Sequence, residues 1–345
     1  MTSTRMAVRR RAHSGAVTLK DVAERAGVAP ITVSRALNAP DSVSAALRAQ
    51  VEEAVSALGY VRNQYAGALA SAASRIIPVI VPSLSNAVFI EVIQGIQQVL
   101  EEAGYQPLLG NTQYDLDRES KLVATLLGWS PAGLIVAGMR HAERTRTLLR
   151  GYGRPLVEIM ELGARPIDMN VGLSHVRAGE TMGQHLVERG YRQIGFIGGR
   201  LKQDYRAAQR YRGLDQALAA AGLARRPPFE HDQKSSAQVG GNALMATLEA
   251  APELDALFFA NDDLAVGALL RAQREGIVVP ARVAIAGFNG LEISALTTPP
   301  LTTIVSPRQQ IGEIAARKLL GRIQGHASGP ARIDVGFRLE VRAST

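Results

Sequence analysis

The residue types that most often perform covalent chemistry are scarce in this chain of 345 residues. It has no cysteine, six histidines, no cluster with metal-ligand spacing and no Gly-x-Ser-x-Gly motif. Thiolate catalysis, disulfides and cysteine metal sites are therefore excluded, and the glycine-rich GFIGGR lacks the spacing of a dinucleotide-binding loop. We predict no enzyme, cofactor or metal. We expect the lone histidines of HAERTRTLLR and HDQKSS, His141 and His231, to face solvent.

Arginine and lysine offer the chemistry that remains, which is the binding of anions. The formal net charge is +8, and residues 1–75 contain ten Arg or Lys against five Asp or Glu. A basic excess concentrated in one short part of the chain is typical of a nucleic-acid-binding head. A solvated charged face has the same composition, so the charge alone leaves both interpretations open.

The elements that would position these side chains start in TLKDVAERAGVAPITVSRALN, residues 18–38. Thr18 and Asp21 have the spacing of a capping box, which predicts a helix directly after Thr18. Pro30 suits the first position of a second helix that runs to about Leu37. Two short helices joined by a tight glycine turn indicate a helix-turn-helix, whose second helix can enter the major groove.

A third helix is predicted for SAALRAQVEEAVSALGY, with Ser44 as its cap. Its apolar residues can bury the inner faces of the first two helices. The pattern alone also allows an inert three-helix bundle. The residues of the predicted apolar face are Leu47, Val51, Ala54, Val55 and Leu58.

This stretch, with VS, LR, LGY and an asparagine at position 63 behind it, closely resembles the headpiece of the lac repressor (LacI) family of bacterial transcription regulators. The resemblance extends over essentially the whole chain after residue 17. It implies a sequence-specific transcriptional regulator, with a pseudo-palindromic double-stranded DNA operator as its partner. It places Pro30, Ile31 and Arg35 toward base edges, and an arginine there can grip guanine as a bidentate pair. It implies contacts with or near phosphates for Thr18, Leu19, Thr32, Ser34, Asn38, Val43 and Ser44.

Two departures from the family pattern stand in the headpiece. Ala29 replaces the usual serine, which removes a helix cap, and Arg62 replaces the usual proline and can add a phosphate contact. In residues 63–75 the resemblance implies a hinge helix that forms on DNA, with Leu69 wedged into the minor groove beside Ala66. A plain flexible linker is the alternative for this segment.

From Ile76 onward, short β-branched runs such as RIIPVIV, GLIVAG and VAIAGF alternate with helical stretches. Continuous apolar strands separated by helices predict parallel, doubly wound sheets in an α/β body. The resemblance implies a two-lobed, periplasmic-binding-protein-like body whose chain crosses between the lobes three times. The expected parts are a disordered basic arm (1–17), an all-α headpiece (18–62), the hinge (63–75) and the body (76–345), with lobe 1 at about 76–176 and 306–335 and lobe 2 at about 177–305 and 336–345.

Ligands of such sheets bind beyond the carboxyl ends of the strands. Polar residues at these ends, with Arg210 added by the family resemblance, would suit hydroxyls and a carboxylate, since arginine forms bidentate pairs with carboxylates. For each residue the alternative is a surface or helix-capping role. The predicted effector-binding residues are Ser83, Phe89, Glu158, Arg200, Arg210, Asn261, Asp262 and Asn289, with Met160, Ser174 and His175 at the same edge.

Within the family, PSLSNAVF, VEIME, AGFNG and PPLTTIVSPR are similar to the gluconate-operon repressors. Asn289 stands where the family usually has an acid. The loss of that charge removes repulsion toward an anion, which favours an aldonate such as gluconate over a neutral sugar as effector. A different sugar, a co-repressor, or a stand-alone solute-binding protein are the alternatives; the headpiece and the lack of a signal peptide oppose the last.

We expect a cytoplasmic protein, because no apolar run approaches the roughly 20 residues of a membrane span. The family resemblance implies a homodimer on the operator. The effector would shift the relative angle of the lobes and so release the DNA. The apolar stripe of Val88, Val92, Ile96 and Val99 is a candidate dimer surface, although it can equally cover the sheet. The last residues lack heptads, so a coiled-coil tetramer is not expected.

Overall fold

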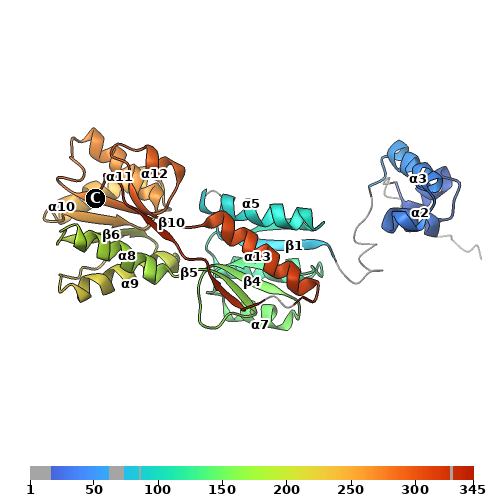
Figure 1. Ribbon diagram of the computed structural model, residues 1–345, viewed down its shortest axis with the longest axis horizontal. Helices are drawn as coiled ribbons and strands as arrows, with labels where there is room; N and C mark the ends of the chain where they lie inside the picture. Colours follow the sequence, from blue (N-terminus) through green and yellow to red (C-terminus); the bar gives the residue numbers. More distant parts are fainter. Residues whose placement is uncertain (1–16, 62–73, 85–86, 327–328) are drawn as a thin grey trace, which may run out of the picture. The chain divides into compact units, whose positions relative to one another are not determined.

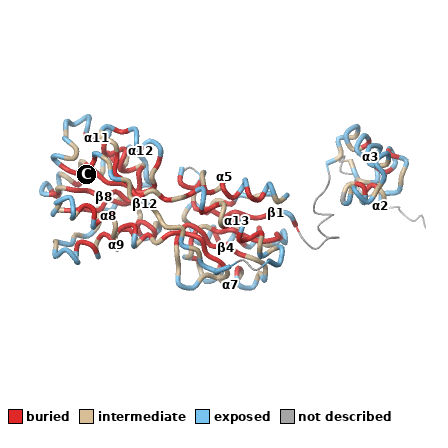
Figure 2. Tube along the Cα trace, in the orientation of Figure 1, coloured by how far each residue is buried: buried red, intermediate tan, exposed pale blue. Residues whose placement is uncertain are grey.

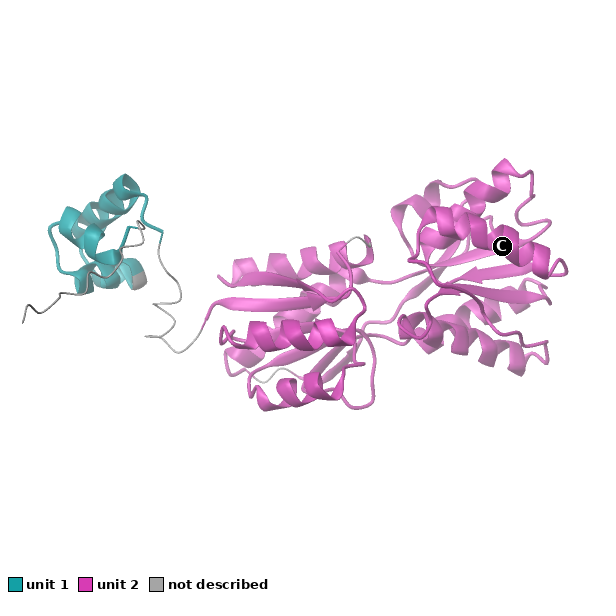
Figure 3. Ribbon diagram, turned by 180° about the vertical axis from the view of Figure 1, so that it is seen from behind, with its two compact units in different colours: residues 1–72 teal, residues 73–345 magenta. Residues whose placement is uncertain are grey.

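The computed structural model describes residues 17–61, 74–84, 87–326 and 329–345, with the side chain of Asn38 set aside. The chain divides into two compact units, residues 1–72 and 73–345 (Figure 3). Each unit has a hydrophobic core of its own.

The first unit is the predicted three-helix headpiece. Thr18 and Asp21 form both hydrogen bonds of the capping box, and the Ser44 hydroxyl accepts a hydrogen bond from the Leu47 amide at 3.3 Å. Ala29 provides no side-chain cap, as predicted. Its elements are α1 (Leu19–Arg25), α2 (Pro30–Asn38), the short 3-10 helix η1 (Pro40–Ser42) and α3 (Ala45–Leu58), which bury Val22, Val33 and Val51 completely.

Lobe 1 of the second unit is a parallel sheet covered by helices on both faces (Figure 1). Because its central strands are buried on both sides, they are apolar almost throughout. The described strands follow the order β11 (Arg332–Asp334), β5 (Met169–Leu173), β4 (Leu156–Glu161), β3 (Leu134–Ala137), β1 (Ile76–Val81) and β2 (Gln106–Asn111), and the helices are α5 (Ala87–Glu102), α6 (Leu116–Leu127), α7 (Glu143–Gly151) and α13 (Arg308–Ile323).

Lobe 2 repeats this architecture, except that its edge strand β12 runs antiparallel to β10. The sheets form the buried centre of both lobes in Figure 2. The described strands follow the order β12 (Arg338–Glu340), β10 (Thr302–Val305), β9 (Ala284–Asn289), β8 (Ala256–Phe259), β6 (Ile194–Gly199) and β7 (Phe229–His231), and the helices are α8 (His175–Glu188), α9 (Tyr205–Ala220), α10 (Ala237–Ala250), α11 (Asp262–Arg274) and α12 (Glu292–Leu296).

The chain passes between the lobes after β5, after β10 and after β11 (Figure 1). It ends in lobe 2, where the buried Thr345 hydroxyl lies 2.8 Å from that of Thr302. The carboxyl ends of the parallel strands in the two sheets face each other, because residues that follow β1 and β2 of lobe 1 and β6 and β8 of lobe 2 line one cavity. This arrangement gathers the residues that follow those strands into one region.

Neighbouring helices within lobe 2 touch backbone to backbone. A Cβ atom built on Gly179 of α8 would lie 1.9 Å from the carbonyl oxygen of Arg210 in α9, and one built on Gly213 of α9 would lie 1.9 Å from that of Val176. Only glycine permits this approach, so the position of Arg210 depends on Gly179.

The prediction of a dimer surface along the apolar stripe of α5 is wrong. Val88, Val92, Ile96 and Val99 are all buried within one copy of the chain, where they pack in the lobe 1 core. The stripe covers the sheet, and a second copy cannot reach it.

Candidate DNA-binding surface and effector cleft

The outer face of α2 presents the three side chains expected to face base edges. Pro30, Ile31 and Arg35 are exposed, and Ile31 keeps 70% of its surface accessible although it is large and apolar. Val33 and Ala36 point the other way, into the headpiece core. The helical period thus separates a packing face from a face that offers one guanidinium and an apolar patch.

The predicted phosphate contacts surround this face. Leu19, Thr32, Ser34 and Val43 are half-buried, while the exposed Thr18 and Ser44 cap α1 and α3 with their hydroxyls. Both hydroxyls therefore cap helices, as predicted, and their phosphate contacts remain a prediction. The side chain of Asn38, and the hinge residues Ala66 and Leu69, lie outside the described residues.

The facing strand ends of the two lobes enclose a cavity of about 180 Å³. Three predicted effector residues line it: Ser83 from lobe 1, and Arg200 and Asn261 from lobe 2. The Asn261 amide donates a hydrogen bond to the Ser235 hydroxyl at 2.9 Å, and its oxygen accepts one from the Leu264 amide at 3.1 Å. Asn261 thus caps α11 and faces the cavity at the same time.

Backbone strain also marks this region. Apart from glycines, the described residues with left-handed φ angles include five that line the cleft cavities: Gln113, Tyr114, Met160, Arg200 and Asn289. Such conformations cost about 1–3 kcal/mol each and cluster at ligand-binding sites.

A smaller cavity of about 40 Å³ continues the cleft inward and holds three further predicted residues, Phe89, Arg210 and Asn289. Arg210 is buried, its guanidinium lies 4.2 Å from the centroid of the Phe288 ring, and its Nη1 donates to His175 Nδ1 at 2.9 Å. Burial, together with the charge of Arg210, lowers the pKa of His175 well below its ordinary value. His175 is therefore neutral at physiological pH.

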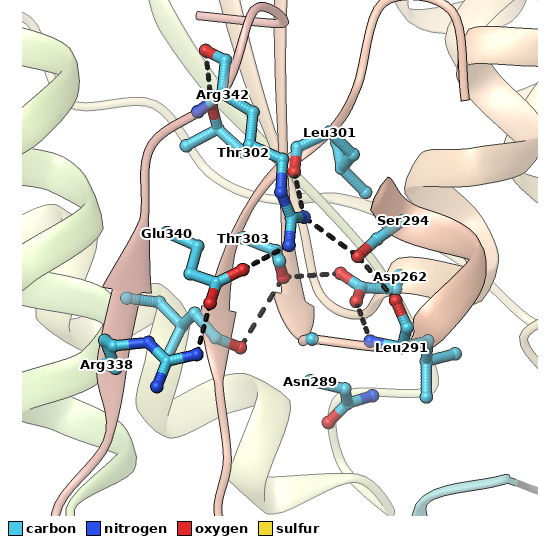
Figure 4. Close-up of polar contacts among 12 residues, drawn as sticks. Asp262, Asn289, Leu291, Ser294, Leu301, Thr302, Thr303, Arg338, Glu340 and Arg342 are labelled. Carbon is cyan, nitrogen blue, oxygen red and sulfur yellow. Dashed lines mark hydrogen bonds and ion pairs between the residues drawn. The ribbon is translucent and has the colours of Figure 1, made fainter. Parts of the chain in front are cut away.

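Asp262 does not enter the cleft, so its predicted effector role is wrong. Its carboxylate accepts hydrogen bonds from the Thr303 hydroxyl and the Leu291 amide, both at 2.7 Å, and is fully buried (Figure 4). Burial raises its pKa to about 6. The carboxylate holds the start of α11 against β10, and the neighbouring Asp263 lines the cavity in its place.

Glu158 and His141 also differ from their predictions, because both are buried in lobe 1. Glu158 accepts a hydrogen bond from the Ile167 amide at 2.6 Å and lies 3.4 Å from His141 Nε2, while His141 Nδ1 lies 2.7 Å from Glu119 Oε1. Burial lowers the pKa of His141, but Glu119 and Glu158 together outweigh it and raise the pKa to about 9. His141 is thus a charged core residue. His231 is only half-buried.

Tyr114, Asp204 and Arg206 are among the cleft residues that were not predicted from the sequence. Arg206 precedes Arg210 by four residues, so the helical period of α9 places both on one face. That spacing is the signal that could have revealed it. Tyr114 follows the edge strand β2 through a short loop, and no motif marks it.

Direct contacts between the lobes border the cleft. The Glu161 carboxylate at the end of β4 accepts hydrogen bonds from the Tyr205 hydroxyl of α9 and from the Met139 amide. The Arg140 guanidinium of lobe 1 donates to the Lys202 carbonyl of lobe 2 at 2.8 Å. These contacts hold the lobes in the present arrangement and would change if the lobes rotated.

Comparison with known proteins places this architecture in a family. Residues 18–63 match the bacterial regulatory proteins of the lacI family, and residues 184–345 match a periplasmic binding protein-like domain. The chain is 42% identical over 334 residues to the HTH-type transcriptional regulator GntR of Pseudomonas aeruginosa, covering 96% of each protein. The chain belongs to the LacI family. It is a DNA-binding transcriptional regulator, as its relatives are, and not an enzyme.

Solved structures of LacI family members agree. A LacI family regulator from Silicibacter pomeroyi superimposes with a TM-score of 0.90 at 40% identity, covering 95% of this chain and 99% of that one. The lac repressor dimer bound to operator and the anti-inducer ONPF gives a TM-score of 0.81 at 27% identity, with 95% and 99% covered. The predicted family, fold class and regulatory function are confirmed. Over the described residues, no helix of this LacI family member is long and apolar enough to cross a membrane, and no cluster of three or more His, Asp or Glu side chains could hold a metal ion.

Proposed function

We propose that this LacI family regulator is a repressor that binds a pseudo-palindromic operator as a homodimer and leaves it when a sugar acid such as gluconate binds in the cleft. The exposed face of α2, with Pro30, Ile31 and Arg35, carries the DNA part of the proposal. The lac repressor, which has the same fold, is a dimer on its operator. The proposal that Leu69, beside Ala66, enters the minor groove rests on the sequence alone.

The cleft supports the effector part of the proposal. Arg200 and Asn261 line its larger cavity, and Arg210 lines the smaller one, so hydroxyls and a carboxylate both find partners. An effector acts only through a difference in its affinity for two lobe arrangements. The bond between Glu161 and Tyr205 and the one between Arg140 and Lys202 link the lobes, and a rotation that breaks them would transmit the effect.

The test is fluorescence anisotropy of a labelled operator from the promoter region of the regulator's own gene, at fixed salt, with and without gluconate. Tight, sequence-selective binding that gluconate weakens is the expected result. Operator binding that gluconate does not change would point to a different sugar as effector. A ligand that strengthens operator binding would be a co-repressor. Absence of sequence-selective binding would refute the DNA part.

Replacing Arg35 with alanine is expected to weaken operator binding by roughly 10- to 100-fold, because one good bidentate contact contributes about 1–3 kcal/mol of discrimination. Binding to a scrambled duplex should weaken far less. Arg225→Ala, which removes an exposed arginine of lobe 2, is the charge-matched control and should leave both affinities unchanged. Equal losses on both duplexes for Arg35→Ala would show that Arg35 contacts only phosphate.

A further inference from the structure

The inner cavity of the cleft contains three hydrogen-bonding side chains that the chain itself does not fully satisfy. Arg206, Arg210 and His175 are 7%, 4% and 3% exposed, and all three line this cavity. Within the described residues, Arg206 Nη1, Arg210 Nε and His175 Nε2 are buried without a hydrogen-bond partner. Buried polar groups are satisfied in the great majority of cases, so three in one cavity call for a ligand.

The tautomer of His175 follows from its neighbour. A guanidinium can only donate, so the 2.9 Å contact from Arg210 Nη1 makes His175 Nδ1 an acceptor. The neutral ring then carries its proton on Nε2. The unpartnered Nε2 is therefore a third N–H donor beside two guanidinium groups, and the ligand that satisfies all three must be an acceptor.

The charges point to an anion. Burial lowers the pKa of Arg206, but the nearby Tyr205, Tyr114, Glu161 and Asp204 outweigh it and raise the pKa, so Arg206 stays charged. Arg210 is not compensated in this way, because burial lowers its pKa to about 10 and Asp204 raises it less. The charged form of Arg210 is therefore costly in this cavity, and a bound anion removes that cost.

Helix dipoles reinforce this preference. The cavity is lined by Phe89 in the first turn of α5, His175 at the start of α8, Arg206 at the start of α9 and Asn261 at the N-cap of α11. Each of these helices directs the positive end of its dipole toward the cavity.

We propose that Arg206, Arg210 and His175 form a carboxylate-binding subsite, and that Arg206 makes the cleft select a sugar acid over a neutral sugar. The inference rests on the proposed function and specifies the chemistry of its effector. The carboxylate occupies the inner cavity of about 40 Å³, and the hydroxylated chain occupies the outer cavity of about 180 Å³. Tyr114, Asp204 and Asn261 line both cavities and join them.

The first experiment compares acids with their neutral amides by calorimetric titration of the full-length protein. The probes are gluconate, galactonate, gluconamide, galactonamide and glucose. We expect an acid to bind about 100-fold more tightly than its amide, and Arg206→Gln to remove most of this difference by weakening the acid. Arg225→Gln is the matched control and should leave both the preference for the acid and operator binding unchanged.

The outcomes separate this inference from the proposed function. If galactonate binds and gluconate does not, the effector assignment changes but the carboxylate subsite stands. If an amide or glucose binds as tightly as the acid, or if Arg206→Gln leaves the preference intact, the subsite is wrong, and release of the operator by an effector is then tested separately by the anisotropy experiment. Tighter binding of glucose 6-phosphate than of any carboxylate would also overturn it.

A second measurement does not depend on which sugar acid is the effector. Sodium acetate at millimolar concentrations should raise the Tm of the full-length protein, whereas acetamide should not, and Arg206→Gln should abolish the acetate effect.

Discussion

Gly179→Ala should destabilise the second unit by about 3 kcal/mol, at the upper end of the range for overpacking, and should abolish effector binding. The new methyl group would lie 1.9 Å from the carbonyl oxygen of Arg210, so α8 and α9 must separate. Because the contact is with backbone, no side-chain rotation relieves it. The separation also moves the Arg210 guanidinium away from His175 and out of the inner cavity.

Chemical denaturation of the full-length protein measures the loss, and titration with the effector measures the binding. Gly151→Ala at the end of α7 is the matched control, because a Cβ atom there meets nothing within 4 Å. That variant should be as stable as the wild type or slightly more so. A denaturation midpoint for Gly179→Ala that equals that of the control would contradict the prediction.

His141→Gln should destabilise lobe 1 by about 3 kcal/mol at pH 7, the lower end for breaking a buried ion pair. The variant leaves the buried carboxylates of Glu119 and Glu158 without their shared cation. His231→Gln, in the half-buried histidine of lobe 2, is the control and should have a much smaller effect.

The pH dependence provides an independent check on the charge of His141. Its pKa is about 9 in the folded protein against an ordinary value of 6.5, so the folded state binds the proton more tightly. The stability that the cluster contributes is therefore complete below pH 6.5 and is lost as the pH rises through about 9. The difference in free energy of unfolding between wild type and His141→Gln should shrink between pH 7 and pH 10. A constant difference would show that His141 is neutral.

The headpiece could be predicted almost residue by residue because its signals are local. The capping box of Thr18 and Asp21, the proline at the start of α2 and the serine before α3 each act within one helical turn, and the structure shows all of them. The edge of the body that holds the cleft was also predictable, since parallel strands end on one side.

The direction of a side chain at that edge was not predictable. Strand β4 is buried on both faces, so its sequence lacks the alternation that would show which way Glu158 points. The same strand ends in the buried Glu161, which bonds to Tyr205 of the other lobe, whereas Glu158 bonds within lobe 1. Asp262 and Asp263 are adjacent at the start of α11, yet Asp262 bonds to β10 and Asp263 lines the cavity. The sequence does not show which of the two faces the cavity.

The sequence by itself determined the helix-turn-helix, the alternation of strands and helices, and the strand ends at which a ligand is expected, because local capping and periodicity are encoded by neighbouring residues. The family and the two-lobed arrangement came from the resemblance of its motifs to the lac repressor family. Only the tertiary structure decided that His141 joins Glu119 and Glu158 in the core, that the α5 stripe covers a sheet, and that Arg206 joins Arg210 and His175 around one cavity. These groupings unite segments that are far apart in the chain. Burial sets the charge of these side chains and their need for a partner, and it exists only after the lobes have packed.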